Sequence, residues 1–544
     1  MGHFLFFLFA GAAGLLWTAA CTAAAARVER GWHKALLAAL GAGVPVIALL
    51  PIVAASWWHA FGMRVEPNWF PQVFTVLVSL FIGGAWIVWA GLAPRDEGET
   101  PAARWPLIGL IALAAIAASV TAGVLLILDN AVQAQAAYLR LEAANLMQVN
   151  LPPIVTDDEN AAPLHLQAGA AITADKEFDA EASPLDPEGD VMREEVTVFL
   201  ARHAATLDLV RRAADRGICR FARDWSRPPI DLVFSEVLTL RNEGRLLALA
   251  ARRAAAEERH ADALADVFRI GRLGHHAAAE PFLVSYLMGN ALESIAWREL
   301  ADLLPQLGPD DAPLLDSTHV RDLVGRPLDL LPALYGEEAF GLAAFAGFAD
   351  GRATPSEILG SDQGDGVPAG FGVEPGFRVF HLPGDLAGYR RMMHAFQQLA
   401  ADRELSANHA ETRRRAEALE KSLVDHPPGV LSRLVVPAIT SVFQARARSE
   451  ALHRAAAVLV AATRQRLESG GLPLEPAAFG TTPPFVLPTD PFAEGNKPLL
   501  MKRSDAGLVT YSVGPDGKDD GGPAPRGEEA EEGNDDVGFV MAVR

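Results

Sequence analysis

Cysteine is nearly absent from this sequence, which holds only Cys21 and Cys219 in 544 residues. Cys21 lies in a long apolar stretch, and Cys219 lies far from it along the chain. This spacing excludes a disulfide framework of the kind that stabilises small secreted proteins. We interpret Cys219 as a small buried residue of a helical core.

Motifs of several large enzyme classes are missing too. The sequence contains no GxSxG, HExxH or Walker pattern and no dinucleotide-binding glycine pattern. Basic residues are outnumbered, with 47 Lys and Arg against 67 Asp and Glu and a net charge of −20. This acidic balance argues against a nucleic acid partner. We therefore expect a protein that is not an enzyme and binds no nucleic acid, and no small-molecule substrate is indicated.

Charged residues are absent from four long apolar stretches, at residues 4–26, 35–60, 71–93 and 105–128. Each stretch is long enough to cross a hydrocarbon core of roughly 30 Å as a helix. The sequence therefore predicts four transmembrane helices in region 1–128, with the lipid bilayer as a partner. A transport function is weakly supported, because these stretches lack the internal ionisable residues that mark a substrate pathway.

The connectors between these stretches predict an orientation. The first connector contains Arg27, Arg30 and Lys34 and the third contains Arg95 and Arg104, whereas the second contains only Arg64. The positive-inside rule then places everything after Leu128 outside the cytoplasm. The predicted localisation is a bacterial inner membrane, with several membrane passes and a large extracytoplasmic C-terminal region. An alternative for residues 4–26 is a cleaved signal peptide, but the basic segment that such peptides carry is missing.

The middle of the chain shows helical periodicity. We predict a stalk helix and linker over residues 129–190 and an extracytoplasmic α-helical domain over residues 191–438. Val196, Phe199 and His203 are spaced three and four residues apart, which marks one apolar helix face. Residues 247–273 resemble one tetratricopeptide-type helical hairpin. No such repeat recurs, so the sequence predicts an irregular helical array.

Histidines in this domain give no clear metal signal. His275 and His276 are adjacent. On a helix, neighbouring side chains point about 100° apart, so the pair cannot bind one metal ion together. We interpret both as surface or capping residues.

Residues 439–544 are predicted to form a long helix and a small α+β module. The stretches PLLMKR, LVTYSV and VGFVMAV have strand composition, and SDAG between the first two is typical of a hairpin turn. The predicted fold class is therefore mainly α: four N-terminal transmembrane helices, an extracytoplasmic helical domain, and a C-terminal module with a three-stranded antiparallel sheet.

Aspartates gather between the second and third predicted strands, at Asp516, Asp519, Asp520, Asp535 and Asp536. Oxygen ligands without His or Cys favour Ca²⁺ over zinc or a redox metal. So many carboxylates on one short loop repel one another unless a cation lies among them. The alternative is a disordered acidic tail, because the spacing is not that of an EF-hand.

A family resemblance supports the calcium interpretation. Along the chain follow Gly471 with Pro473, DPF at 490–492, GNKPL at 495–499, YSVGPDG at 511–517, GG at 521–522 and DDV at 535–537. This order resembles the C-terminal portion of the type II secretion major pseudopilins. The resemblance implies a structural calcium loop with Asp516, Asp519, Asp535 and Asp536 as ligands, Asp520 next, and the Val513 carbonyl as a further ligand.

Together these features favour a membrane-anchored extracytoplasmic scaffold or interaction protein of a bacterial cell envelope, associated with secretion and with other envelope proteins as partners. The alternative is an enzyme that processes an envelope polymer. Its active site would lie in the helical domain, where the Gly-, Pro- and Asp-rich loop 351–376 would cover a cleft.

Overall fold

The computed structural model describes residues 131–176, 178, 190–223, 235–316, 327–350, 382–402, 409–425, 430–472, 486–504, 507–523 and 534–542. These residues are mainly helical, with a three-stranded antiparallel sheet in the C-terminal part. The chain divides into two compact units, residues 1–140 with 344–384 and residues 141–343 with 385–544. All the sites discussed below lie in the second unit.

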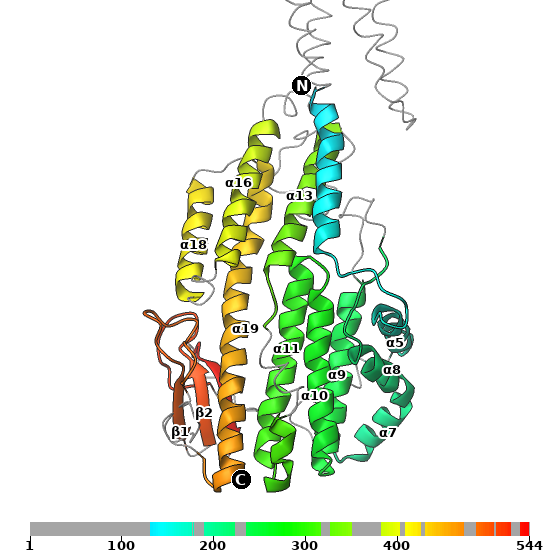
Figure 1. Ribbon diagram of the computed structural model, residues 1–544, viewed down its shortest axis with the longest axis vertical. Helices are drawn as coiled ribbons and strands as arrows, with labels where there is room; N and C mark the ends of the chain where they lie inside the picture. The colour runs from blue at the N-terminus through cyan, green and yellow to red at the C-terminus, as the bar shows by residue number, and fades with distance from the viewer. Residues whose placement is uncertain are drawn as a thin grey trace, which may run out of the picture. The chain divides into compact units, whose positions relative to one another are not determined.

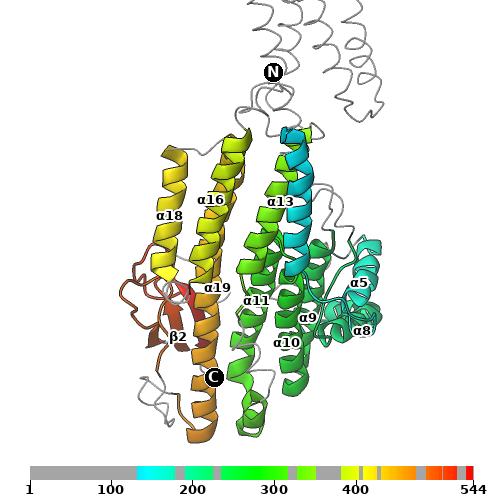
Figure 2. The same cartoon turned by 45° about the horizontal axis from the view of Figure 1, so that its top comes forward.

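Four of the described helices form the centre of the second unit (Figure 1). They are α9 (Ser235–Ala256), α10 (His260–Ala278), α11 (Leu283–Leu303) and α19 (Val430–Ser469). Helix α10 packs against both α9 and α11, and α11 also packs against α19. The second view shows the same side-by-side order (Figure 2).

Helices α9 and α10 form a hairpin within the stretch where the sequence predicts one. The turn between them is closed by a hydrogen bond of 2.8 Å from the Arg259 backbone N–H to the Ala254 carbonyl. The small residues Ala251, Ala255 and Ala263 are buried in the apolar core. Alanine at these positions leaves room for the two helices to approach closely.

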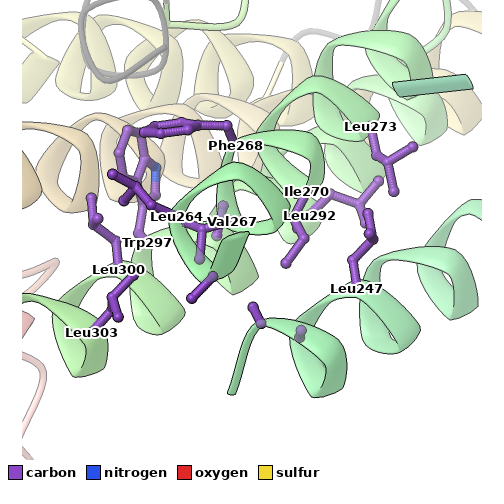
Figure 3. Close-up of a cluster of buried hydrophobic side chains, with 14 of the residues drawn as sticks. Leu247, Leu264, Val267, Phe268, Ile270, Leu273, Leu292, Trp297, Leu300 and Leu303 are labelled. Carbon is purple, nitrogen blue, oxygen red and sulfur yellow. The ribbon is translucent and has the colours of Figure 1, made fainter. Parts of the chain in front are cut away.

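The main core lies between α9, α10 and α11 (Figure 3). Leu247 comes from α9, Leu264 and Phe268 from α10, and Leu292 and Trp297 from α11, and all five side chains are buried. Burial of an aliphatic or aromatic side chain of this size stabilises the folded state by about 1.5–3 kcal/mol. The Trp297 ring also meets the His453 ring of α19 edge-on, with 5.0 Å between the ring centroids.

Three shorter helices precede this core: α5 (Ala162–Ala174), α7 (Glu194–Arg202) and α8 (Ala204–Ala214). Helix α5 packs against α8 and α9. Its Gly169 lies so close to α9 that a Cβ atom there would be 3.0 Å from the Thr239 Oγ1 atom. The missing side chain at residue 169 thus lets α5 approach α9, which brings His165 of α5 near Glu243 of α9.

The remaining helices are α13 (Leu331–Asp350), α16 (Leu382–Ala401) and α18 (His409–Asp425), with the 3-10 helices η3 (Leu304–Gln306) and η4 (Pro309–Asp316); residues 131–150 are also helical. Glu337 of α13 accepts a hydrogen bond of 3.0 Å from the backbone N–H of Leu283, the first residue of α11. An acidic group at a helix N-terminus is stabilising. Helix α18 packs against α19.

The sheet contains β1 (Leu500–Ser504), β2 (Gly507–Ser512) and β3 (Val537–Ala542) in the order β1-β2-β3, all antiparallel. Every residue of the central strand β2 is buried. Strands β2 and β3 pack against α19 (Figure 1). Leu508, Phe539 and Met541 belong to the same apolar cluster as the helical core. The sheet and the central helices therefore share one core.

The predicted fold class needs one correction, which concerns its four transmembrane helices. Within the described ranges, no helix is both long enough and apolar enough to cross a membrane. The physical reason is that these helices carry charges within their length, such as Glu293 and Glu299 in α11. The supported fold is mainly helical with a C-terminal three-stranded antiparallel sheet. Segments 4–26, 35–60, 71–93 and 105–128 lie outside the described residues, and the inner-membrane localisation stays a prediction.

Candidate functional site

The turn before β1 organises the base of the C-terminal acidic loop. Asp490, from the DPF piece, is buried and accepts hydrogen bonds from the Ser512 hydroxyl (2.5 Å), the Phe492 N–H (2.8 Å) and the Val513 N–H (3.0 Å). One carboxylate thus connects the turn to the end of β2. The loop starts at Val513 with its direction set by these bonds.

Backbone contacts then hold the loop against its neighbours. Gly514 has a positive φ of 66°, and a Cβ atom there would lie 1.8 Å from the Asp535 carbonyl oxygen. Only glycine fits this close approach. From α18, the Arg413 guanidinium donates a hydrogen bond of 2.5 Å to the Pro515 carbonyl and lies over the Phe492 ring at 5.7 Å.

Asp536 is the most enclosed of the predicted calcium ligands, with 7% of its surface exposed. Its Oδ2 atom accepts hydrogen bonds from the backbone N–H groups of Gly522 (2.6 Å) and Asp520 (3.1 Å). Its Oδ1 atom is buried and finds no hydrogen-bond partner within the described part of the chain. Burial raises the pKa of Asp536, and the carboxylates of Asp520 and Asp519 raise it further, against the lowering effect of the Gly522 N–H.

Asp519 and Asp520 approach Asp536 from the other side of the loop. Asp519 Oδ1 accepts hydrogen bonds from the Tyr511 hydroxyl (2.9 Å) and the Gly521 N–H (3.0 Å). Asp520 Oδ2 accepts one of 3.2 Å from the Asp535 N–H. Asp519 and Asp520 thus lie near enough to Asp536 to raise its pKa, but among the described residues no three carboxylates of the loop lie close enough together to bind one ion as they stand.

Asp516 and Asp535 are placed differently. The Lys518 ammonium lies 2.9 Å from Asp516 Oδ2, and the Lys518 N–H donates to Asp516 Oδ1, which together lower the Asp516 pKa. Asp535 is exposed. The pKa of Lys518 is raised mainly by Asp516, with smaller effects of Asp520 and Asp535. A lysine cation thus lies among the carboxylates where the sequence predicts a metal cation.

A second polar cluster, in the helical part, was missed by sequence reasoning. It consists of His165 of α5, His276 of α10 and Cys219, whose exposed fractions are 1%, 4% and 2%. Each offers a ligand atom, and these atoms all lie within 4.8 Å of one another. Among the described residues, this is the group of three His, Cys, Asp or Glu side chains that is compact enough to hold a metal ion.

Hydrogen bonds connect the two rings of the cluster to each other and to their surroundings. His165 Nε2 lies 3.0 Å from His276 Nδ1. His165 Nδ1 lies 2.6 Å from Oε2 of the buried Glu243 of α9, and His276 Nε2 lies 2.9 Å from the Arg216 carbonyl oxygen. Burial lowers the pKa of each histidine to about 3 and raises the pKa of Glu243 and of the Cys219 thiol.

Cys219 is positioned by an extended segment that follows α8. Ile218 forms a parallel bridge with Asn160, and the Ala161 N–H donates a hydrogen bond of 2.8 Å to the Ile218 carbonyl. The Asn160 side chain is bonded to both the N–H and the carbonyl of Arg220, at 2.8 Å each. These bonds fix the backbone on both sides of Cys219 next to the start of α5.

The interpretation of His276 as a surface or capping residue is wrong, because its ring is buried. The histidine that lies beside His276 in the structure is His165, and not its chain neighbour His275. His165, Cys219 and His276 come from three segments more than fifty residues apart. Their spacing forms no local motif, so a buried position for each of them was the only available signal.

Comparisons with known proteins add no assignment to either cluster. The chain matches no protein-family model, no curated protein and no solved structure. The resemblance of the C-terminal residues to pseudopilins therefore stays a prediction.

Proposed function

We propose that this chain is a structural or interaction protein of a bacterial cell envelope, with an extracytoplasmic C-terminal sheet that a calcium ion stabilises. One observation carries the calcium part of the proposal. Asp536 Oδ1 is buried and has no hydrogen-bond partner among the described residues, and it lies near the carboxylates of Asp519 and Asp520. An unpaired buried carboxylate oxygen is costly, and a calcium ion would satisfy it and balance the neighbouring charges.

The buried acids of the helical part support a structural function. Arg211 binds Asp266 through two hydrogen bonds of 2.9 and 2.5 Å, which joins α8 to α10. Arg252 binds Glu299 through two of 2.8 Å, which joins α9 to α11. Paired, bidentate contacts of this kind fix the geometry between helices. These carboxylates are engaged in holding the helices together.

The enzyme alternative receives less support. An enzyme needs convergent ionisable groups that a substrate can reach. His165, His276 and Glu243 do converge, but all three are buried. The loop 351–376, expected to cover a cleft, lies outside the described residues. The buried cluster therefore favours a role in the structure of the protein over a role in catalysis.

Calorimetric titration of the full chain with Ca²⁺ tests the proposal. We expect one site with Kd on the order of 10⁻⁴ M or below. Asp536→Asn should weaken binding at least about tenfold, because it removes charge from the most enclosed ligand. Asp208→Asn is the matched control, because Asp208 is an exposed aspartate on α8 paired only with Arg212 at 3.3 Å. Absence of both heat and thermal stabilisation in the unaltered chain would contradict the calcium site.

The interaction part needs a separate measurement. We expect the full chain to retain specific envelope proteins in the presence of Ca²⁺, and the Asp536→Asn variant to lose them while its helical content is unchanged by circular dichroism. Equal retention of these proteins by the variant would show that the calcium loop is not part of the interaction surface.

A further inference from the structure

The cluster of His165, Cys219 and His276 is not used by the function proposed above, and it lies in the helical core rather than in the acidic loop. Its three side chains come from α5, from the segment after α8, and from α10. A buried group of two imidazoles and a thiol is a ligand set for a borderline or soft metal ion.

In each of the two histidine rings, the nitrogen that faces away from the other ring already has a hydrogen-bond partner. His276 Nε2 lies 2.9 Å from the Arg216 carbonyl oxygen, which can only accept, so Nε2 carries the proton and Nδ1 carries a lone pair. His165 Nδ1 lies 2.6 Å from Glu243 Oε2. Metal-binding histidines almost always bond a carboxylate or a backbone carbonyl through their other nitrogen. Both rings therefore show the surroundings of metal ligands.

The other two ring nitrogens face each other, and the distance between them is close to the distance between two nitrogen ligands of one metal ion. His165 Nε2 and His276 Nδ1 are 3.0 Å apart. In a tetrahedral zinc site with Zn–N bonds of 2.0–2.1 Å, two nitrogens are about 3.3 Å apart. A shift of about 0.3 Å would thus admit the ion. The Cys219 sulfur, within 4.8 Å of the ring nitrogens, needs to be about 3.6 Å from them.

The charges also balance for a divalent ion. When a metal binds, the Cys219 thiol becomes a thiolate and Glu243 becomes a carboxylate, which gives two negative charges in a buried volume. A divalent cation neutralises them, which removes the large penalty of an uncompensated buried charge. The nearby Glu280 is bound by the Arg223 guanidinium at 2.7 and 2.9 Å, and the same guanidinium also lies 3.1 Å from Glu236.

A metal-free arrangement also satisfies the rings and must be distinguished by experiment. In it the proton lies on Glu243, which donates to His165 Nδ1. His165 Nε2–H donates to His276 Nδ1, and His276 Nε2–H donates to the Arg216 carbonyl. All groups in this chain of hydrogen bonds are neutral, and no ligand is needed.

We propose that His165 Nε2, His276 Nδ1 and Cys219 Sγ bind one zinc ion, with Glu243 and the Arg216 carbonyl orienting the two rings. Zinc fits this ligand set better than calcium or magnesium, which prefer oxygen ligands. Copper(I) accepts the same ligands, but it would leave the buried cluster with a net negative charge.

The first test uses the unaltered full chain, purified without an affinity histidine tag. We expect one zinc per chain by mass spectrometry of the metal content. X-ray absorption should show one sulfur at about 2.3 Å and two nitrogens at about 2.0–2.1 Å from the zinc. Cobalt(II) substitution should give a thiolate-to-cobalt charge-transfer band. These measurements do not depend on whether any variant folds.

Variants then assign the ligands. Cys219→Ser should abolish the cobalt charge-transfer band, while Cys21→Ser, at the only other cysteine, should leave it unchanged. His276→Gln should lower zinc affinity by much more than His275→Gln, which changes the adjacent and more exposed ring. Glu243→Gln tests positioning: it should weaken zinc binding by about 10–100-fold without changing the stability of the metal-free chain, because a Gln N–H can still donate to His165.

Some results would overturn the proposal. A metal-free full chain that takes up neither zinc nor cobalt after refolding with either ion would favour the neutral chain of hydrogen bonds. Copper(I) bound in place of zinc would refute the choice of metal. A charge-transfer band that survives Cys219→Ser would remove Cys219 from the ligand set. Because the Ca²⁺ titration concerns different residues, failure of one site leaves the other testable.

Discussion

The acidic loop and the buried histidine-cysteine cluster gather polar atoms in opposite ways. In the loop, Asp516 to Asp520 are neighbours in the chain, and hydrogen bonds from the loop's own N–H groups hold the carboxylates. In the cluster, residues from three distant segments meet inside a helical core, and side chains or carbonyls of other segments fix them. The loop is held mainly by its own backbone, with further bonds from Asp490 and from Arg413 of α18, whereas the cluster exists only when the helices have packed.

This difference predicts how each ion would affect the protein. An ion in the loop stabilises local backbone at the surface, next to solvent that competes for every ligand. An ion in the cluster connects α5, α10 and the segment after α8, so losing it affects the packing of the core.

Selective metal removal should separate the two sites most clearly. With free zinc a thousandfold above its Kd, the ion contributes about 4 kcal/mol to the free energy of unfolding. A zinc-specific chelator should therefore lower the midpoint of unfolding of the helical part strongly. A calcium-specific chelator should instead speed hydrogen exchange of the Asp520 and Gly522 amides, which are bound to Asp536 Oδ2.

If the two chelators have the same effect, the two ions do not stabilise different parts of the protein. A large loss of core stability on calcium removal would show that the loop is coupled to the core through the shared apolar cluster of β2, β3 and the helices. The calcium-specific chelator applied to Asp536→Asn is the control, and it should change nothing.

A buried carboxylate of the core should give the protein a pH dependence that extends to neutral pH. Burial in α11 raises the pKa of Glu293 to about 8 from the usual 4.5, and the Glu450 carboxylate of α19 adds to this rise, while Ser449 opposes it. The His275 ring of α10 lies 3.5 Å away. Glu293 thus stays protonated in the folded state between these two pKa values, and its own contribution to stability falls as the pH rises from 4.5 to 8. The lowered pKa of the buried His165 and His276 acts in the opposite direction below pH 6.5.

Glu293→Gln, which keeps the shape without the charge, should flatten this dependence. We expect a relative gain on the order of 4 kcal/mol at pH 8 and little change near pH 4.5. Chemical unfolding at several pH values measures this free energy of unfolding. Asp208→Asn, which changes an exposed aspartate, is the control. A variant with the same pH slope as the unaltered chain would show that Glu293 does not titrate in this range.

The smallest effect concerns the lysine in the acidic loop. Lys518 pairs with Asp516 and competes with a metal cation for the same carboxylates. Lys518→Met should therefore raise the calcium affinity by about two- to fivefold. Lys421→Met, at an exposed lysine of α18, should leave it unchanged. Calcium binding that weakens in Lys518→Met would mean that Lys518 supports the loop instead of competing with the ion.

Local chain pattern sufficed for much of the fold. The strands were predicted from composition within two residues of their ends, since a turn such as Ser504 to Gly507 fixes its hairpin locally. The α9–α10 hairpin followed from alanines at helical spacing. The shared core of sheet and helices could not be predicted, because it depends on how Leu508 and Met541 pack against helices far away in the sequence.

The two sites also differ in how far the sequence predicts them. The acidic loop was visible because its aspartates are neighbours, yet composition did not reveal that Lys518 takes the place of a cation beside Asp516. The buried cluster was invisible because His165, Cys219 and His276 only meet in three dimensions. From the sequence, Cys219 and His276 had each been assigned an ordinary role, and His165 had been assigned none.

The shared core has a consequence for how the chain is made on the ribosome. The apolar cluster contains Ala161 near its start and Met541 near its end. At about 5–20 residues per second, β3 follows the end of α19 by roughly 4 to 14 s. During that interval the helices lack the strand that covers them. The growing chain therefore needs protection of this apolar surface until β3 has been made.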